Sequence, residues 1–259
     1  YYFARELQRA RGGAIGLLNT STPATGIETW LSKAAAQAVY GPGLFEQPGR
    51  FRRDLQDPSV FFYGKVAPVM RLGVAGILWY QGDGSLPAVG YAYRRAIPAL
   101  IEDWRTGFDK GALPFFIVQI PIFEGCSPEM RESQMLSVLR TTHAGLAVTL
   151  DVGEAGNIHP RHKRPVGERL ALLARHVAYD EPIECMGPIY RHMEVRDGQA
   201  LLSFDHVGTG LLLKGAAGFE VKAAAGPYVP GQVRVVGDDA LAVWHPDVQQ
   251  PVAVRYAWA

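Results

Sequence analysis

The sequence is short of several features that would assign it to a particular class of protein. It has only two cysteines, Cys126 and Cys185, which is too few for a disulfide framework or a set of cysteine metal ligands. Lys and Arg number 26 against 25 Asp and Glu, a balance that argues against a nucleic-acid binder. No apolar run approaches the ~20 residues that span a bilayer. We therefore expect neither nucleic acid nor membrane as a partner.

The commonest cofactor and nucleophile motifs are also missing. There is no Gly-x-Gly-x-x-Gly pattern and no P-loop, so nothing predicts a nucleotide, and we expect no cofactor. There is no Gly-x-Ser-x-Gly elbow to present a serine nucleophile. The chain begins Tyr1-Tyr2-Phe3, with neither an initiator Met nor a signal peptide, and we expect further residues upstream in the parent protein.

The sequence is long, rich in apolar residues, and built of apolar runs that alternate with amphipathic segments. Its 259 residues are 48% apolar, enough to bury a large core in one domain or in one domain with a small second one. Short apolar runs alternate with amphipathic segments, which is typical of a parallel sheet covered by helices on both faces, a three-layer α/β domain. The predicted strands are 14–19, 73–80, 113–121 and 146–151, and the predicted helices are 27–38, 91–104 (broken or kinked near Pro98), 129–142 and 166–179.

The pattern changes after about residue 182. Short alternating segments separated by turn formers predict an antiparallel β module. They are 191–195, 200–204, 232–236, 240–244 and 252–258. We therefore expect an α/β domain over 1–182 and a β-rich accessory module over 183–259. We expect core or interface roles for Trp244 and Trp258 in this module.

Candidate functional residues follow the predicted strands, because ligands of open α/β sheets bind beyond the carboxyl ends of the strands. The most informative loop runs from Asp151 through Glu154 to His159. A histidine held by a carboxylate can act as general base for a hydroxyl nucleophile. The alternative is that His159 only makes local hydrogen bonds. His159 and His162 also raise the possibility of a metal, but no third ligand lies nearby in the sequence, so we expect no metal site.

Several blocks of the sequence resemble, in order, the sialate O-acetylesterase family of SGNH-type carbohydrate esterases. The similarity runs through nearly the whole chain, and the blocks are specific only when taken together. They are 57–68 (DPSVFFYGKVAP), 76–82 (GILWYQG), 91–105 (ending IEDWR), 113–119 (LPFFIVQ), 131–134 (RESQ), 158–171 (IHPRHK followed by VGERLA) and 251–258 (PVAVRYAW).

The resemblance implies an SGNH-hydrolase-like fold and hydrolysis of O-acetyl esters of sialic acid or related sugars. In such a reaction a serine attacks the acetyl carbonyl, a histidine takes its proton, and nearby donors hold the oxyanion. His159 matches the catalytic histidine in its Ile-His-Pro setting. Asp151 is the expected orienting carboxylate, with Glu154 as the alternative.

The resemblance also implies a set of oxyanion or substrate-binding residues. Gln81 and Gly82 match the Gln-Gly pair at a strand end that lines the family's pocket, and Ser85 stands where the family has an oxyanion-donating asparagine. Gln134, with Arg131, matches an Arg-Glu-x-Gln block that supports the pocket.

The sequence departs from the family where the chemistry would occur. The family's serine lies in a Gly-Gln-Ser-Asn block upstream of a helix that corresponds to residues 1–7, which implies that the nucleophile is absent from this chain. Pro23 and Ala24 replace two glycines, and a proline has no N–H to donate to an oxyanion. Losing one oxyanion donor, as in the replacement of asparagine by Ser85, can cost on the order of 3 kcal/mol of transition-state stabilisation.

Two hypotheses follow. In the first, the protein is a serine-dependent esterase whose nucleophile is supplied by an N-terminal segment or another chain. In the second, it is a catalytically impaired relative that binds a glycan or acts as a scaffold; a third and weaker alternative is a different ester substrate. Ser21, Ser85 and Ser133 are candidate replacement nucleophiles, although local turn hydrogen bonds are the expected role of Ser21 and Ser85. Bacterial members of this family lead us to expect an extracellular or periplasmic protein.

Overall fold

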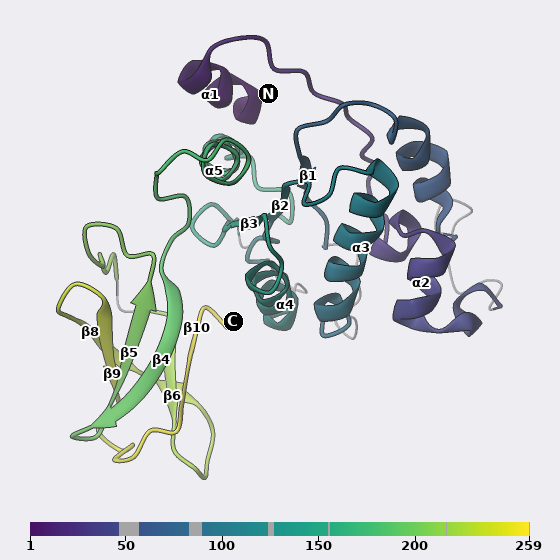
Figure 1. Ribbon diagram of the computed structural model, residues 1–259. Helices are drawn as coiled ribbons and strands as arrows, with labels where there is room; N and C mark the ends of the chain where they lie inside the picture. Colours follow the sequence, from purple (N-terminus) through teal and green to yellow (C-terminus); the bar gives the residue numbers. More distant parts are fainter. Residues whose placement is uncertain (47–56, 83–89, 124–126, 155, 216, 259) are drawn as a thin grey trace. The chain divides into compact units, whose positions relative to one another are not determined.

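The chain forms two compact units. The computed structural model describes residues 1–46, 57–82, 90–123, 127–154, 156–215 and 217–258 (Figure 1). Unit 1 comprises Tyr1–Cys185 and unit 2 comprises Met186–Ala259.

A parallel sheet forms the centre of unit 1. Its described strands are β1 (Ile77–Trp79), β2 (Phe115–Val118) and β3 (Ala144–Ala147), in the order β1-β2-β3. Ile77 pairs with Phe115, and Phe115 pairs with Ala144. All of β2 is buried, as expected for a central strand covered on both faces.

Helices cover both faces of this sheet, so unit 1 has the expected three-layer α/β architecture. In Figure 1, α3 (Tyr93–Phe108) and α4 (Pro128–Leu139) lie on one side of the strands and α5 (Arg164–Leu173) lies on the other. The buried residues of α3 recur every three or four positions, which is the spacing of one helix face. They are Tyr93, Ala96, Ile97, Leu100, Ile101, Trp104 and Phe108.

Two glycines allow α5 to lie close to its neighbours on both sides. A Cβ on Gly145 of β3 would lie 2.5 Å from Leu173 Cδ2 of α5. A Cβ on Gly167 of α5 would lie 2.4 Å from the Cβ of Tyr2, in helix α1 (Tyr2–Arg11). Glycine at these two positions lets α5 pack tightly between β3 and α1.

Shorter helices complete unit 1. Ser32 begins α2 (Lys33–Tyr40) by accepting a hydrogen bond from Ala35 N through its side chain. The remaining described elements are η1 (Ile27–Trp30), η2 (Pro42–Phe45), η4 (Phe62–Val66), η5 (Ala67–Val69) and η7 (Ala174–Ala178). No helix of the described residues is long and apolar enough to cross a membrane.

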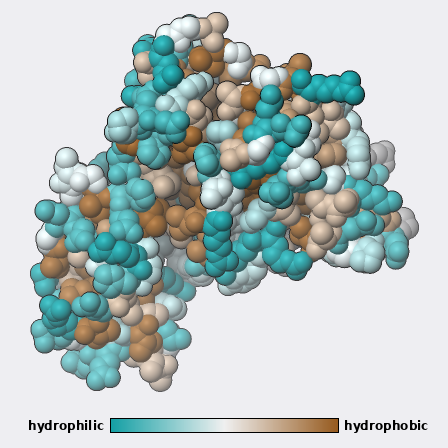
Figure 2. Space-filling model, in the orientation of Figure 1, coloured by the Kyte–Doolittle hydropathy of each residue, from teal (hydrophilic) through white to brown (hydrophobic). Residues whose placement is uncertain are grey.

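The described part of unit 2 contains β-strands and no helix, and it has its own core. One sheet has the order β4-β5-β9-β8 and the other the order β10-β6-β7, with antiparallel pairing in both. On the face seen in Figure 2 the surface of this unit is a mixture of hydrophilic and hydrophobic residues. The strands are β4 (Ile189–Arg196), β5 (Gln199–Asp205), β6 (Phe219–Lys222), β7 (Val229–Pro230), β8 (Gln232–Val236), β9 (Ala240–Trp244) and β10 (Ala253–Tyr256).

The strand predicted at 14–19 is wrong. This segment is not paired with any strand of the described chain, and it is largely exposed, with Leu17 and Leu18 at 55% and 54%. An apolar run becomes a strand only where a neighbour supplies hydrogen-bond partners and cover.

Other boundaries differ in smaller ways. The helix predicted over 27–38 is two elements, because Leu31 has extended backbone and Ser32 caps a new helix. Helix α3 continues through Pro98 instead of breaking there. The strand predicted at 146–151 begins earlier and ends at Ala147. Strands β6 and β7 were not predicted, because they are short and lie between turn formers.

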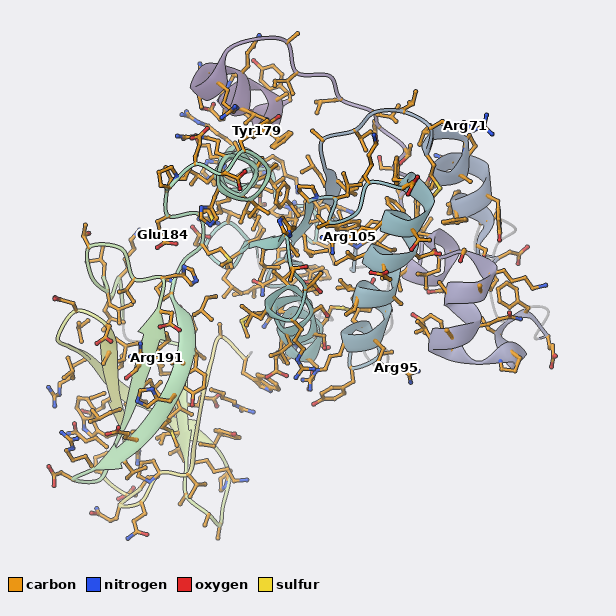
Figure 3. The ribbon with its side chains drawn as sticks, in the orientation of Figure 1. Arg71, Arg95, Arg105, Tyr179, Glu184 and Arg191 are labelled. Atoms are coloured by element: carbon orange, nitrogen blue, oxygen red, sulfur yellow. The ribbon has the colours of Figure 1, made fainter. Side chains whose placement is uncertain are left out.

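The IEDWR block, residues 101–105, is a scaffold element. Asp103 accepts hydrogen bonds from the backbone N and hydroxyl of Ser32, both at 2.7 Å, and thereby ties α3 to the start of α2. Arg105, labelled in Figure 3, donates to the carbonyl oxygens of Leu113, Thr142 and His143 at 2.9, 2.8 and 3.2 Å. It therefore joins α3 to the segments that lead into β2 and β3.

Candidate functional site

A buried network of amide groups lies where β1 and β2 end. Gln81 donates through Nε2 to the carbonyl oxygen of Thr25 at 2.8 Å, and its Oε1 accepts from the hydroxyl of Tyr93. Gln134, on α4, donates to the carbonyl oxygen of Gln81 at 3.1 Å and accepts from the backbone N of Ile120 at 2.9 Å. Gln134 and Tyr93 are both fully buried, so these bonds satisfy groups that have no access to water.

Gly82 is required by the packing of this network. Its φ is 147°, and a Cβ there would lie 2.7 Å from Ile120 Cγ2 and 3.2 Å from Gln134 Nε2. Any larger residue would push the strand end away from α4. The structure thus brings together Gln81, Gly82 and Gln134 of the predicted binding residues.

A loop from the N-terminal part of unit 1 reaches the same place. Lys65 holds this loop by donating to Thr22 Oγ1 at 2.6 Å and to the carbonyl oxygen of Ser21 at 3.3 Å. Ala24 has a φ of 57°, a conformation that favours glycine. The loop therefore keeps a glycine-like backbone although it carries alanine at 24, next to Pro23.

The histidine predicted to be catalytic lies in the exposed segment after β3. The backbone N of His159 donates to Asn157 Oδ1 at 2.9 Å, and the residue itself is exposed. Glu154 Oε1 accepts from the backbone N of Arg161 at 2.7 Å, and this bond is the main reason that the pKa of Glu154 lies below its ordinary value. The Asn157 amide and the Arg161 guanidinium lower the same pKa further.

Asp151 makes a two-pronged ion pair with Arg169 of α5. The Asp151 carboxylate oxygens lie 2.7 and 2.6 Å from the two terminal nitrogens of Arg169, which also donates to the carbonyl oxygen of Val148 at 2.6 Å. This pairing fixes the start of the segment against α5. Asp151 and Glu154 are therefore both held by arginine residues, and the role of either in orienting His159 stays a prediction.

One contact connects the His159 segment to the end of β1. Lys163 Nζ donates to the hydroxyl of Tyr80 at 3.3 Å and lies 4.9 Å from the centre of its ring. Tyr80 directly precedes Gln81, and Lys163 comes four residues after His159. The parts of the chain that carry the histidine and the amide network therefore meet at the carboxyl edge of the sheet.

The candidate serines occupy different environments. Ser21 makes the expected local turn, with its N and Oγ bonded to Asn19 Oδ1 at 3.0 and 2.7 Å. Ser133 is fully buried and accepts from Arg94 Nε at 3.3 Å. Ser85 lies outside the described residues, as does Cys126.

Some members of the network carry no recognisable signal in the sequence. Thr25 and Ile120 take part through backbone atoms, which every residue has. Tyr93 fits the apolar spacing of α3, so periodicity predicts it as a core residue and says nothing of its hydroxyl. Buried tyrosine hydroxyls usually find a partner, and this rule alone would have prompted a search for one.

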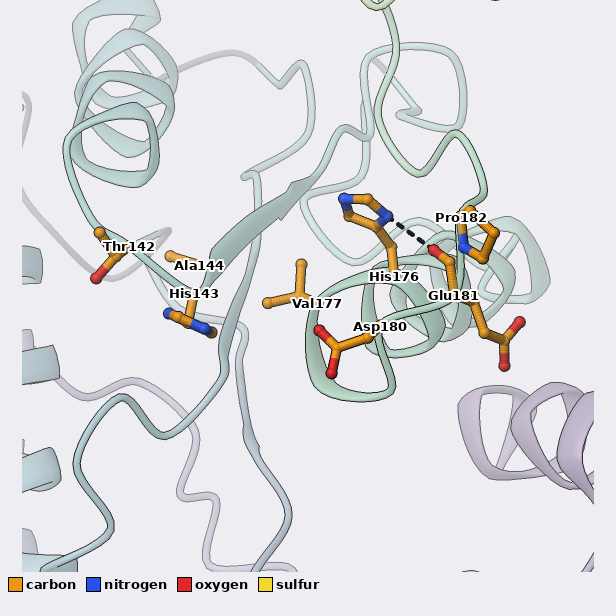
Figure 4. A pocket seen from close by; sticks show the side chains of 8 residues that line it. All are labelled: Thr142, His143, Ala144, His176, Val177, Asp180, Glu181 and Pro182. Carbon is orange, nitrogen blue, oxygen red and sulfur yellow. Dashed lines mark hydrogen bonds between the residues drawn. The ribbon is translucent and has the colours of Figure 1, made fainter.

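Two open hollows lie at the opposite edge of the sheet. The larger, of about 480 Å³, is next to Ala144 at the start of β3 and is shown in Figure 4, where His176 Nδ1 lies 3.0 Å from the carbonyl oxygen of Glu181. A smaller one of about 420 Å³ adjoins Arg105. Because ligands of parallel sheets bind at the carboxyl ends of the strands, we place the candidate site at Gln81 and His159 instead.

Nothing in the described part of the chain assembles a metal centre. No group of three or more His, Cys, Asp or Glu side chains is placed there to hold a metal ion. His159 and His162 are both exposed.

Comparison with known proteins identifies the family to which the chain is similar. Residues 1–174 match the family model of carbohydrate esterases described as sialic acid-specific acetylesterase. The sialate O-acetylesterases of Pongo abelii and Homo sapiens are each 27% identical to the chain, over 286 and 289 residues that include all of it. The chain spans 55% of the length of each of these two relatives.

A solved structure agrees with this assignment. The carbohydrate acetylesterase of Xanthomonas citri is 32% identical, superposes with a TM-score of 0.89, and is matched over all of this chain and 59% of its own. The three-layer arrangement of unit 1, followed by antiparallel sheets, is thus that of an SGNH-like carbohydrate esterase. The chain belongs to the sialic acid-specific acetylesterase family of carbohydrate esterases.

Proposed function

We propose that the protein containing this chain is a serine-dependent O-acetylesterase that acts on acetylated sialic acid or a related sugar. The observation that carries the proposal is the match of residues 1–174 to the sialic acid-specific acetylesterase family. The site described above supports it, because the amide network and the His159 segment lie at the same edge of the sheet.

In this proposal His159 acts as the general base. It takes the proton of the attacking serine hydroxyl and returns it to the sugar oxygen as the acetyl group is transferred to the enzyme; water then releases acetate. An exposed histidine in a segment that is anchored at its start and braced within itself can do this. Asp151 anchors the segment to α5 through Arg169, and the bond from the backbone N of Arg161 to Glu154 braces the turn that contains His159.

The serine would come from a part of the protein outside these 259 residues. Two features of unit 1 support this. The β1 edge of the sheet has no partner strand among the described residues, and Leu78 on β1 is 39% exposed. The apolar segment 14–19 of unit 1 is largely exposed as well. A further strand that carries the serine would cover such apolar surface and complete the sheet.

The alternative is a relative that binds acetylated glycans without hydrolysing them. Pro23 favours this alternative, because a backbone without an N–H at that position removes one possible oxyanion donor. Both possibilities predict that the protein binds an acetylated glycan, but only the esterase hydrolyses it.

Acetate release by the full-length protein decides between them. We expect hydrolysis of an O-acetylated sialic acid, and a fall of at least about 1000-fold in kcat/KM for His159→Ala, as for loss of a general base. His162→Ala is the matched control, because it removes another exposed histidine of the same segment, and it should stay within about 3-fold of wild type. Binding of the glycan with no turnover would establish the alternative. Turnover that survives His159→Ala would refute the assignment of the base.

A further inference from the structure

The loop that reaches the candidate site forms a turn with one end fixed in the core. Thr25 is 5% exposed, and its carbonyl oxygen accepts from Gln81 Nε2 at 2.8 Å. Its hydroxyl accepts from Trp30 Nε1 at 2.9 Å and donates to the carbonyl oxygen of Thr22 at 3.1 Å. The two residues between these threonines are both exposed. They form the tip of the turn, which faces solvent.

Lys65 fixes the other end of the turn. This half-buried residue of η4 donates through Nζ to Thr22 Oγ1 at 2.6 Å and to the carbonyl oxygen of Ser21 at 3.3 Å. The bond to Thr22 joins residues that are 43 positions apart in the sequence, so it ties the turn to a separate part of unit 1. A charged donor makes this bond stronger than one between neutral groups.

The tip needs both anchors, because its backbone conformation is unfavourable for the residue that it carries. Ala24 has a φ of 57°, and a residue other than glycine keeps such a conformation only where its surroundings hold it there. Pro23 cannot share the adjustment, because its ring fixes its own φ. Releasing Thr22 would therefore let Ala24 rotate to a more ordinary conformation, and the tip would move.

The turn lies where its position matters for the proposed reaction. Gln81, which anchors the turn, directly follows Tyr80, and the hydroxyl of Tyr80 accepts from Lys163 of the His159 segment. Groups around a reacting bond must be held within roughly 0.5 Å of their working positions. A misplacement of about 1 Å can cost about 100-fold in rate.

We propose that Lys65 is a positioning residue of this site, which acts through Thr22 to keep the tip of the turn in its working conformation. This inference rests on the proposed function, since it concerns the geometry in which the same reaction takes place. It gives Lys65 no contact with the substrate.

Two substitutions that break the same hydrogen bond test it. Lys65→Met keeps the aliphatic part of the side chain, and Thr22→Val removes only the hydroxyl. The full-length protein is assayed on an O-acetylated sialic acid, and rates are expressed per active site titrated with a serine-reactive phosphonate. We expect kcat to fall about 10-fold in each variant, with KM within about 2-fold, because a displaced tip weakens contacts made in the transition state. The double variant should be no slower than either single one.

Lys33→Met is the matched control. The Nζ of Lys33 lies 5.6 Å from the centre of the Phe45 ring, much as that of Lys65 lies 5.7 Å from the centre of Phe61, but Lys33 is on α2. This variant loses the same charge beside a similar ring and should keep the kcat and KM of wild type.

Crystal structures of wild type and of the two variants supply a readout that does not depend on catalysis. In wild type the φ of Ala24 should be near 57°. In Lys65→Met and Thr22→Val we expect Ala24 to leave the positive-φ region or the tip to adopt more than one conformation. An unmoved tip in both variants would refute the inference.

The kinetic results can refute it as well. A fall in kcat for Lys65→Met without one for Thr22→Val would show that the ammonium acts directly, and additive losses in the double variant would show that the two residues act separately. If wild type is active and both variants are equally fast, this inference fails while the esterase proposal stands. If wild type releases no acetate, the esterase proposal fails, and the crystal structures alone decide whether Lys65 positions the tip.

Discussion

Gln134 shows how one buried side chain can fix the positions of two strand ends. Its amide joins α4 to the ends of two strands, because it donates to the carbonyl oxygen of Gln81 and accepts from the backbone N of Ile120. The side chain is fully buried, so water cannot replace either bond. Gly82 then allows the strand end to approach this amide closely.

Replacing this amide by a hydrocarbon of similar size tests its role. Gln134→Leu leaves the Ile120 N–H and the Gln81 carbonyl unpaired, and we expect the free energy of unfolding to fall by about 2–4 kcal/mol. Urea denaturation followed by fluorescence measures it. Gln8→Leu, the same change at an exposed position of α1, should alter stability by less than about 0.5 kcal/mol. Similar effects of the two substitutions would contradict a structural role for the buried amide.

Among the elements, α5 connects most parts of unit 1. It packs on β3 through Leu173 and Gly145, it carries α1 on its other side at Gly167, and its Arg169 anchors the segment that contains His159. Arg11 of α1 also pairs with Glu181 at 2.7 Å, after the end of η7. The position of the candidate general base thus depends on how this one helix is seated.

A single methyl group at Gly167 would disturb this arrangement. The new Cβ would meet the Tyr2 Cβ at 2.4 Å and the Phe3 backbone N at 2.7 Å, and backbone atoms cannot swing aside as side chains do. We expect Gly167→Ala to destabilise unit 1 by about 1–3 kcal/mol, despite the ~1 kcal/mol by which alanine favours a helix over glycine. Amide hydrogen exchange should rise in α1 before it rises in β2.

Gly16→Ala provides the comparison for this prediction. Gly16 has open space where its Cβ would be, so the substitution should leave exchange in α1 unchanged. Unaltered protection of α1 in Gly167→Ala would mean that α1 does not rest on α5 as tightly as the geometry indicates.

At the scale of the whole chain, each unit has a separate hydrophobic core. In unit 1 the core gathers around α3 and the sheet, with Ile97 and Phe115 fully buried. In unit 2 the core is formed mainly by side chains of β5, β6 and β9, with Val221 and Val243 fully buried. Separate cores are the physical basis for domains that unfold independently.

A cavity in one core should therefore lower stability and raise hydrogen exchange mainly in the unit that contains it. We expect Val243→Ala to cost about 2 kcal/mol and to raise hydrogen exchange in β5 and β9, with β2 unaffected. Ile97→Ala is the reciprocal variant and should raise exchange in α3 and β2 while sparing β9. If either variant loosened both units to the same extent, the chain would unfold as a single cooperative unit.

Local patterns in the sequence determined most of the elements and pointed to several residues of the candidate site. Alternation located β8 and β9 at their observed bounds, 232–236 and 240–244, and apolar spacing located α3 and α4. The family motifs pointed to Gln81, Gly82 and Gln134, which the fold brings together. These features are accessible because each depends on side chains whose spacing repeats or whose order is distinctive.

What only the tertiary structure decided is how these pieces are paired. The segment 14–19 is as apolar as a buried strand, yet it stays unpaired among the described residues because strand formation requires a neighbour to bond with. The buried amide network likewise depends on tertiary structure. It includes the hydroxyl of Tyr93, the carbonyl of Thr25 and the backbone N of Ile120, which the fold brings next to Gln81 and Gln134. Hydrogen bonds between residues distant in sequence depend on where the folded backbone places each donor and acceptor, and no local pattern encodes that placement.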